Sequence, residues 1–193
     1  GQHGANRPGG NALLDGQVFG RISGRQAAET AMNLKQEPEA VFRRVKRFLS
    51  RLGRMGKGKE ASRARKEIQS ITSRFASVVR TEKGLHEGLK RLTALKKEGV
   101  AIDERGVAFA LETENLLDVA EMILKACLLR KESRGPHLFF RHFEAPRPLP
   151  SLDPKGRRYI VIRNRSGKMT LERRVPVKLR IDPTRREIKE APE

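Results

Sequence analysis

The sequence predicts a mainly α-helical fold, an antiparallel helical bundle of three long helices. Apolar residues recur every three or four positions along most of residues 11–132, which is the period of an α-helix. Charged residues make up 34% of the chain and apolar residues 37%, a balance that suits elongated amphipathic helices around a thin core. After Gly135, prolines and then alternating apolar residues replace this pattern, and they predict an extended segment followed by a β-hairpin.

A glycine-rich loop at the start of the chain leads into the first predicted helix. We expect this helix from near Asn11, which suits an N-cap, to near Met32, because Leu14, Val18 and Ile22 recur every fourth residue. Three glycines share this spacing: Gly16, Gly20 and Gly24. Glycine destabilises a helix, so its recurrence indicates close packing against a neighbour.

Three helical stretches are expected to form the bundle, over residues 38–52, 59–97 and 107–132. Pro38 opens the first stretch, since proline is favoured at the first position of a helix. The second stretch carries a heptad-like apolar seam, and Gly84 interrupts or bends its path. Together they predict a spectrin-repeat-like arrangement.

The third stretch is the most apolar, and we expect it to stop at Gly135, with Pro136 behind it. Its predicted buried residues are Val107, Leu111, Leu117, Ile123, Leu124, Cys127 and Leu128. The hairpin is predicted from a strand at 159–162, a turn at 164–167 and a second strand over 169–181. The chain then divides into three predicted parts: residues 1–33, 36–135 and 136–193.

Charge and motif content exclude several kinds of site. Residues 53–60 nearly fit a phosphate-binding loop, but Glu60 replaces the hydroxyl residue and a helix precedes the loop, so we expect a solvated interhelical connection. The four histidines have no metal-ligand spacing, so no metal site is predicted. No apolar run approaches the roughly 18 residues of a membrane span. Cys127 is expected to be a buried apolar residue.

The formal net charge of +19 leaves the partner open. Such a charge is typical of nucleic-acid binding or of an anionic surface, and it also arises when an acidic partner or an acidic remainder of the same polypeptide is absent. Aromatic residues make up only 5% of the chain and offer little for stacking on bases. Nucleic acid is therefore not the favoured partner.

The most specific string is the one that runs from His3 to Asp15, HGANRPGGNALLD, followed by VFGR at 18–21. It is a glycine-rich loop that enters a helix N-terminus, where free N–H groups and a partial positive charge favour an anion or an electron-rich ring edge. Arg7 lies in the same loop, and a guanidinium can hold a carboxylate with two hydrogen bonds. A capped loop with a surface arginine is the alternative interpretation.

This string resembles the loop H-G-A-N-R-L-G-G-N-S-L-L-D of the succinate dehydrogenase and fumarate reductase flavoprotein family. Another similarity covers 111–120 and 132–137, which resemble the long C-terminal helix of that family and its E-S-R-G-A-H motif. The two similarities occur in the family's order. They imply an FAD-dependent oxidoreductase of which this chain is the C-terminal portion.

The resemblance implies roles for four residues of the loop. Arg7 matches the arginine that binds a substrate carboxylate beside the flavin. Asn11, Ala12 and Leu13 match the flavin-contacting segment, so the first predicted part belongs with the FAD-binding domain. Ala12 replaces the frequent serine, which removes a hydroxyl but keeps the backbone donor. The proton-transferring residues of the family lie upstream, so no catalytic residue is assigned to this chain.

The implied chemistry is hydride transfer between a dicarboxylate, succinate or fumarate, and flavin N5. We expect FAD to be shared with an upstream domain, the isolated chain to be inactive, and the partners to be the remainder of the flavoprotein and an iron–sulfur electron-transfer subunit. We also expect a cytoplasmic location, with peripheral attachment to the inner face of the cell membrane left open. The alternatives are a fragment resembling L-aspartate oxidase and a basic helical module that binds nucleic acid.

Overall fold

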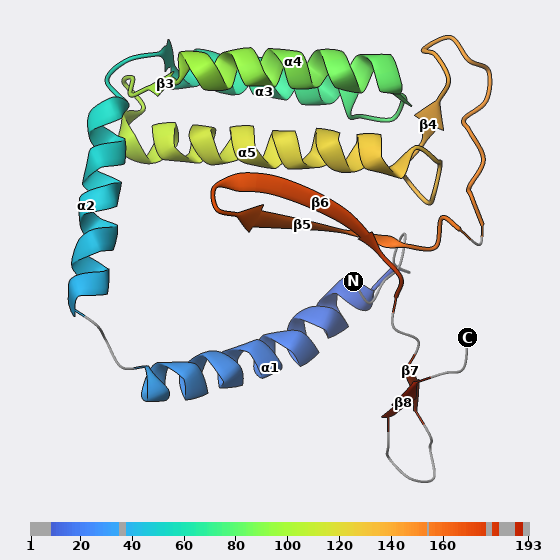
Figure 1. Cartoon of the computed structure of the whole chain (residues 1–193), viewed down its shortest axis with the longest axis horizontal. Coiled ribbons are helices and arrows are strands. Elements are labelled where there is room, and N and C mark those ends of the chain that lie inside the picture. Colours follow the sequence, from blue (N-terminus) through green and yellow to red (C-terminus); the bar gives the residue numbers. More distant parts are fainter. Residues whose placement is uncertain (1–8, 35–37, 154, 177–178, 182–187, 191–193) are drawn as a thin grey trace.

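The computed structural model describes residues 9–34, 38–153, 155–176, 179–181 and 188–190. These residues form five helices, which hold most of the described chain, and several short strands (Figure 1). The elements are α1 (Asn11–Asn33), α2 (Pro38–Arg54), β1 (Lys59–Glu60), α3 (Ala61–Phe75), β2 (Arg80–Thr81), α4 (Glu82–Glu98), β3 (Val100–Ala101), α5 (Gly106–Arg130), β4 (Phe139–Phe140), β5 (Tyr159–Arg165), β6 (Lys168–Arg174), β7 (Leu179–Ile181) and β8 (Ile188–Glu190).

The predicted three-helix bundle is confirmed, but its helices are α3, α4 and α5. These three lie side by side and pack pairwise (Figure 1). The predicted stretch 59–97 is two helices, because the chain turns after Phe75 and the Thr81 side chain caps α4 by accepting a hydrogen bond from Gly84 N at 3.1 Å. The helix predicted at 38–52 is α2, which runs to Arg54 and meets the bundle only near its C-terminal end.

The core of the bundle is built from small residues and aliphatic side chains. Its buried apolar residues on the three helices are Ala61, Ala64, Ile68 and Ile71 of α3, Leu85, Leu92 and Leu95 of α4, and Ala110, Leu117, Ala120, Leu124 and Cys127 of α5.

The buried face predicted for α5 is confirmed in part. Leu117, Leu124 and Cys127 are buried, and the predicted Leu111 and Leu128 are partly buried against the same core. Burial of Val107 and Ile123 is wrong, since they are 42% and 44% exposed. The apolar character of this helix therefore extends beyond the face that the bundle covers.

A close contact between α3 and α4 depends on two glycines one turn apart. A Cβ on Gly84 would lie 3.3 Å from Cδ1 of Phe75, and a Cβ on Gly88 would lie 3.1 Å from its Cδ2 and 2.6 Å from Cδ2 of Leu124. The Phe75 ring therefore occupies space that a side chain at either of these two glycine positions would fill. The interruption or bend predicted at Gly84 is wrong at this position, because Gly84 lies in the first turn of α4 and the observed break falls before it, between Phe75 and Glu82.

Short parallel strand pairs close both ends of the bundle. β1 pairs with β3, and β2 pairs with β4. Lys59 therefore lies in a strand where a helix was predicted, and the cause is Gly58: its φ is 131°, and a Cβ there would lie 2.6 Å from the backbone of Gly99. The connection predicted to be solvated also contributes to the core, because Met55 is 1% exposed.

The helix α5 ends earlier than predicted. Lys131 adopts a left-handed conformation with φ 48° and donates its N–H to the carbonyl oxygen of Cys127. Gly135 has a positive φ but lies in the following turn, where Arg134 and His137 pair through their backbones. The helix therefore stops at a lysine, which the sequence pattern did not indicate.

The predicted hairpin is confirmed as β5 and β6, which lie alongside α5 (Figure 1). Ser166 and Gly167 form its turn with positive φ angles, and Oδ1 of Asn164 accepts a hydrogen bond from Gly167 N at 2.8 Å. The second strand ends at Arg174, shorter than predicted, and residues 179–181 pair with 188–190 instead.

A buried carboxylate joins the C-terminal segment to the bundle. The side chain of Glu132 is 2% exposed and accepts hydrogen bonds from Arg130 Nη1 at 3.0 Å, Arg134 Nη2 at 3.1 Å and Leu152 N at 2.6 Å. Arg134 also pairs with Asp153 at 2.8 Å. Burial acts to raise the pKa of Glu132, but the donors from Arg134, Leu152 and Arg130 outweigh it and lower that pKa.

The α3–α4 contact predicts a selective response to added methyl groups. Gly88→Ala should destabilise the bundle by about 1–3 kcal/mol, because the new Cβ overlaps side chains of α3 and α5. Gly16→Ala is the matched control, since nothing lies within 4 Å of a Cβ at that position of α1. Urea unfolding followed by circular dichroism measures both. Equal stability of the two variants would contradict the packing described here.

The Glu132 cluster predicts a pH-dependent loss of stability. Because its pKa is lowered in the folded state, the stabilisation is present above the ordinary carboxyl pKa and is lost as the pH falls through the folded pKa. Glu132→Gln should therefore cost about 3 kcal/mol at pH 7 and less at pH 3. Glu172→Gln, in an exposed hairpin ion pair, should cost under about 1 kcal/mol. A pH-independent deficit in Glu132→Gln would show that the charge is not the cause.

Candidate functional site

The predicted flavin-contacting segment is the N-terminal end of α1. Gly10 precedes the helix with φ 84° and ψ −30°, and Asn11, Ala12 and Leu13 are its first three residues. Asn11 is therefore the first helical residue and not the N-cap, which is a correction to the sequence prediction. The helix itself, expected from near Asn11 to near Met32, is confirmed at Asn11–Asn33.

This helix end is exposed, and its first backbone N–H groups have no acceptor among the described residues. Gly10, Asn11, Ala12 and Leu13 are all exposed, with Leu13 at 80%. The N–H of Leu13 donates to Gly10 O at 3.2 Å, and the N–H groups before it have no acceptor within the helix. The first turn contains no acidic residue that would offset the positive end of the helix dipole. The geometry fits an anionic or electron-rich group.

Arg7 and His3 lie outside the described residues, so the structure does not test the predicted carboxylate contact. The position of Arg7 in the sequence places it four residues before Asn11. Its role in substrate binding stays a prediction.

The body of α1 lacks a packing partner within the described chain. No residue of this helix is buried. Leu14, Val18 and Ile22 are 65%, 44% and 51% exposed along one face. Nothing lies within 4 Å of a Cβ added at the three glycines of the predicted close contact. The described residues therefore do not supply the neighbour that the glycine spacing indicates.

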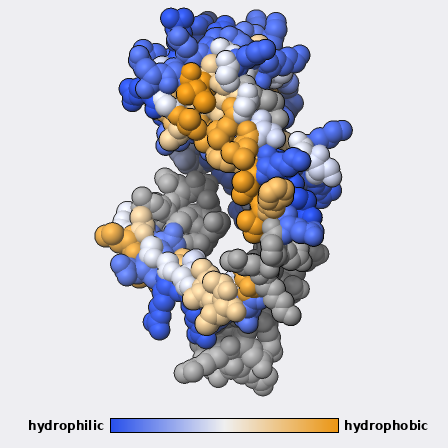
Figure 2. All heavy atoms as spheres, turned by 90° about the vertical axis from the view of Figure 1, so that its left-hand side faces the viewer, coloured by the Kyte–Doolittle hydropathy of each residue, from blue (hydrophilic) through white to orange (hydrophobic). Residues whose placement is uncertain are grey.

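Most of the helix α2 also lacks a packing partner within the described chain. It carries an apolar strip whose members are between 46% and 70% exposed: Val41, Phe42, Val45, Phe48 and Leu49. Figure 2 faces the side of the molecule that carries α2, and it shows apolar side chains gathered there. The strip ends at Leu52, which packs against the bundle core. Both N-terminal helices thus present apolar surface that the bundle does not cover.

The second sequence similarity, at residues 132–137, forms a structural cluster. Glu132 and Arg134 hold the C-terminal segment, as described above. The ring of His137 has a buried Nε2 without a hydrogen-bond partner among the described atoms, and its pKa is lowered to about 4 by burial and by the charges of Arg80 and Arg130. This histidine is neutral at pH 7.

The single cysteine behaves as the sequence predicts. Cys127 lies in the core of the bundle and is 8% exposed. Burial raises the pKa of its thiol, so the sulfur stays protonated at neutral pH. The predicted role of a small buried apolar residue is confirmed.

Two kinds of site are missing from the part of the chain that the structure describes. No group of three or more His, Cys, Asp and Glu residues there is arranged to hold a metal ion. None of the described helices combines the length and the apolar character needed to cross a membrane.

One structural site, the buried Glu132 cluster, was not predicted as such. The sequence shows this cluster only as the string Glu-Ser-Arg. The pattern of charges alone does not tell whether such residues are buried or lie on the surface.

Comparison with known proteins identifies the bundle. A family model described as fumarate reductase flavoprotein C-term matches residues 65–142. The chain is 30% identical over 149 residues to the fumarate reductase flavoprotein subunit of Haemophilus influenzae, covering 71% of this chain and 25% of that protein. It is 32% identical over 146 residues to the mitochondrial succinate dehydrogenase flavoprotein subunit of Oryza sativa subsp. japonica, covering 70% and 23%.

Solved structures agree with the sequence comparisons. The Mycobacterium smegmatis Sdh1 complex in the apo form contains a chain that matches with a TM-score of 0.70 and 28% identity, over 90% of this chain and 30% of that one. The Escherichia coli quinol fumarate reductase matches with the same TM-score at 24% identity, which shows a common fold. The chain spans about a quarter of the length of the two curated relatives. The chain belongs to the succinate dehydrogenase and fumarate reductase flavoprotein family, and its helical bundle is the C-terminal domain of that family.

Proposed function

We propose that this chain is the C-terminal part of an FAD-dependent enzyme that transfers a hydride between succinate or fumarate and flavin N5. The observation that carries the proposal is the open N-terminus of α1. It lies directly after Gly9 and Gly10, is exposed, and has no acidic residue in its first turn. The family membership of the bundle supports a flavin as the group that this helix end meets.

The free backbone N–H groups of Asn11 and Ala12 would hold the edge of the isoalloxazine ring, with Leu13 beside them. When bound, the flavin supplies the hydride-accepting and hydride-donating centre at N5. The helix end stabilises negative charge on the ring, because its free N–H groups and its dipole point toward it. Ala12 contributes no hydroxyl, so its contribution is limited to the main chain.

Arg7 would bind one carboxylate of the dicarboxylate substrate. A guanidinium offers two parallel N–H donors, which fixes both the position and the orientation of a carboxylate. This contact positions the substrate and moves no proton. The residues that donate or accept protons are proposed to lie in the remainder of the flavoprotein.

The uncovered faces of α1 and α2 support that remainder as the first partner. Apolar strips of this size are unfavourable in water, and packing against the flavin-binding part would bury them. An iron–sulfur electron-transfer subunit is the proposed second partner. We further propose that the assembled protein is cytoplasmic and attached peripherally to the inner face of the cell membrane.

Replacing Arg7 tests the substrate contact. In the flavoprotein that contains this chain, Arg7→Gln should lower kcat/KM for succinate oxidation by about 10²-fold or more, because the substrate loses its bidentate anchor. Arg25→Gln is the matched control, since its exposed pairing with Glu29 is worth little. Steady-state kinetics measure both. Retained kcat/KM in Arg7→Gln would remove Arg7 from the site.

Replacing Ala12 tests the backbone donor. Ala12→Pro deletes one N–H, and proline is tolerated in the first turn of a helix. The reduction potential of the flavin should become more negative, because its reduced, anionic form loses a donor. Ala12→Ser keeps the N–H and should leave the potential close to that of the parent protein. A spectroscopic redox titration distinguishes the two, and an unchanged potential in Ala12→Pro would contradict the proposed contact.

A further inference from the structure

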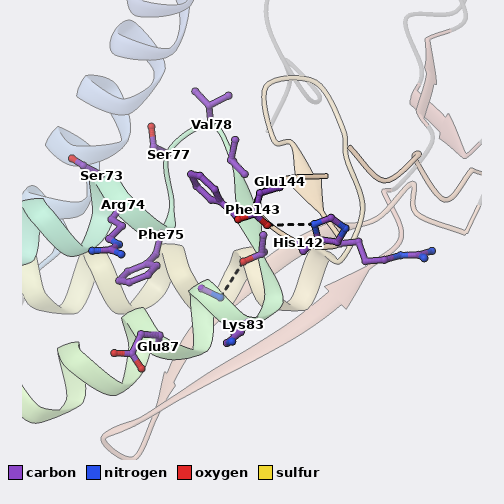
Figure 3. Close-up of a pocket in the computed structure, with 14 residues that line it drawn as sticks. Ser73, Arg74, Phe75, Ser77, Val78, Lys83, Glu87, His142, Phe143 and Glu144 are labelled. Atoms are coloured by element: carbon purple, nitrogen blue, oxygen red, sulfur yellow. Dashed lines mark hydrogen bonds and ion pairs between the residues drawn. The ribbon is translucent and has the colours of Figure 1, made fainter. Parts of the chain in front are cut away.

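A pocket of about 750 Å³ opens at the end of the bundle that is closed by β2 and β4. Three segments build it: the end of α3, the turn and first residues of α4, and the loop that follows β4 (Figure 3). Small-molecule sites commonly have volumes of about 300–1,000 Å³. The lining residues lie between 73 and 87 and between 141 and 144, so the pocket shares no residue with the proposed flavin site.

The pocket contains an apolar patch with a fixed base. Phe75 is held against the glycines of α4, where no side chain displaces its ring. Val78 and Phe143 also line the pocket and are 63% and 69% exposed, which is unusual for large apolar residues in adjacent segments. Figure 3 shows that Val78 and Phe143 come from two different segments of the chain. Solvent therefore meets a preformed apolar surface.

The rim of the pocket carries cations that the described chain leaves without acids. Among the described residues, neither Lys83 nor Arg141 forms an ion pair. Of the two acids on the rim, Glu87 is engaged, because it accepts a hydrogen bond from Arg91 Nε at 2.9 Å. Glu144 is exposed, and Nδ1 of His142 lies 3.8 Å from it, beyond hydrogen-bond distance (Figure 3). Arg74 also lines the pocket without an ion pair among the described residues, so the cations of the lining outnumber its acids.

We propose that this pocket binds an anionic amphiphile, a medium-length hydrocarbon chain with a carboxylate or phosphate head. The chain would cover Phe75, Val78 and Phe143, and the head would lie between Lys83 and Arg141. Apolar contact drives the burial of the tail, and the unpaired cations select the sign of the head group. A neutral or cationic amphiphile meets the same apolar surface without the electrostatic attraction.

Calorimetric titration of the full 193-residue chain tests both parts of the proposal. Decanoate and decyltrimethylammonium share a tail and differ in the sign of the head, and both are used below micelle-forming concentrations. Decanoate should bind with one site per chain and at least about tenfold more tightly than the cationic amphiphile. The double variant Lys83→Glu, Arg141→Glu should weaken decanoate binding by about tenfold, whereas Lys66→Glu on α3, away from the pocket, should not.

Ser77→Trp tests the location of the site. Ser77 is exposed and lines the pocket, so the indole should fill the pocket without disturbing the core and should abolish binding. Ser50→Trp on α2 is the matched control and should bind normally. Circular dichroism confirms that each variant folds. Absence of decanoate binding to the parent chain, equal binding of the two amphiphiles, or full binding by Ser77→Trp would each overturn the proposal.

Discussion

The burial of apolar surface divides this chain into a bundle with its own core and two N-terminal helices whose apolar faces are largely uncovered. The helices α3, α4 and α5 bury one another's apolar faces, so the bundle has its own core. In contrast, α1 has no buried residue, and α2 joins the core only through its C-terminal end. Helices in proteins are stable mainly because they pack. The helix end that would meet the flavin therefore belongs to an element that the described residues do not support by packing, and in the proposed assembly the remainder of the flavoprotein supplies that support.

The buried Glu132 carboxylate holds the C-terminal segment against the bundle. A carboxylate without partners at this depth would be strongly unfavourable, so Arg130, Arg134 and Leu152 N must all be in place together. This requirement fixes where the chain returns after β4 and where the hairpin meets α5. The motif at 132–137 thus acts as an anchor, and its neutral, half-buried histidine agrees with a structural role.

Sequence periodicity predicted which segments are helical, and it did less well on where they end. Residues 76–81 contain neither glycine nor proline, so the break between α3 and α4 left no sign in the sequence, whereas Gly84 suggested a break where there is none. The burial of Met55 and the approach of Gly58 to Gly99 are contacts between distant segments, which a local pattern does not contain. The start of α1 at Asn11 was predictable because a glycine-rich loop and a helix start are local, whereas the site roles assigned there come from the family resemblance and stay predictions. Arg7 lies outside the described residues.

The arrangement of charge on α2 bears on the second proposed partner. At 100° per residue, Arg43, Lys46 and Arg47 fall on the side of the helix opposite the apolar strip, and all three are exposed. If the remainder of the flavoprotein covers the strip, this cationic side stays in water. The first turn of α2 contains a single acidic residue, Glu39, which pairs with Arg43. An exposed cationic ridge favours an acidic electron-transfer partner over a basic one, since opposite charge speeds encounter. The net charge of +19 would then reflect the partners that the assembly requires, and nucleic acid is not needed to explain it.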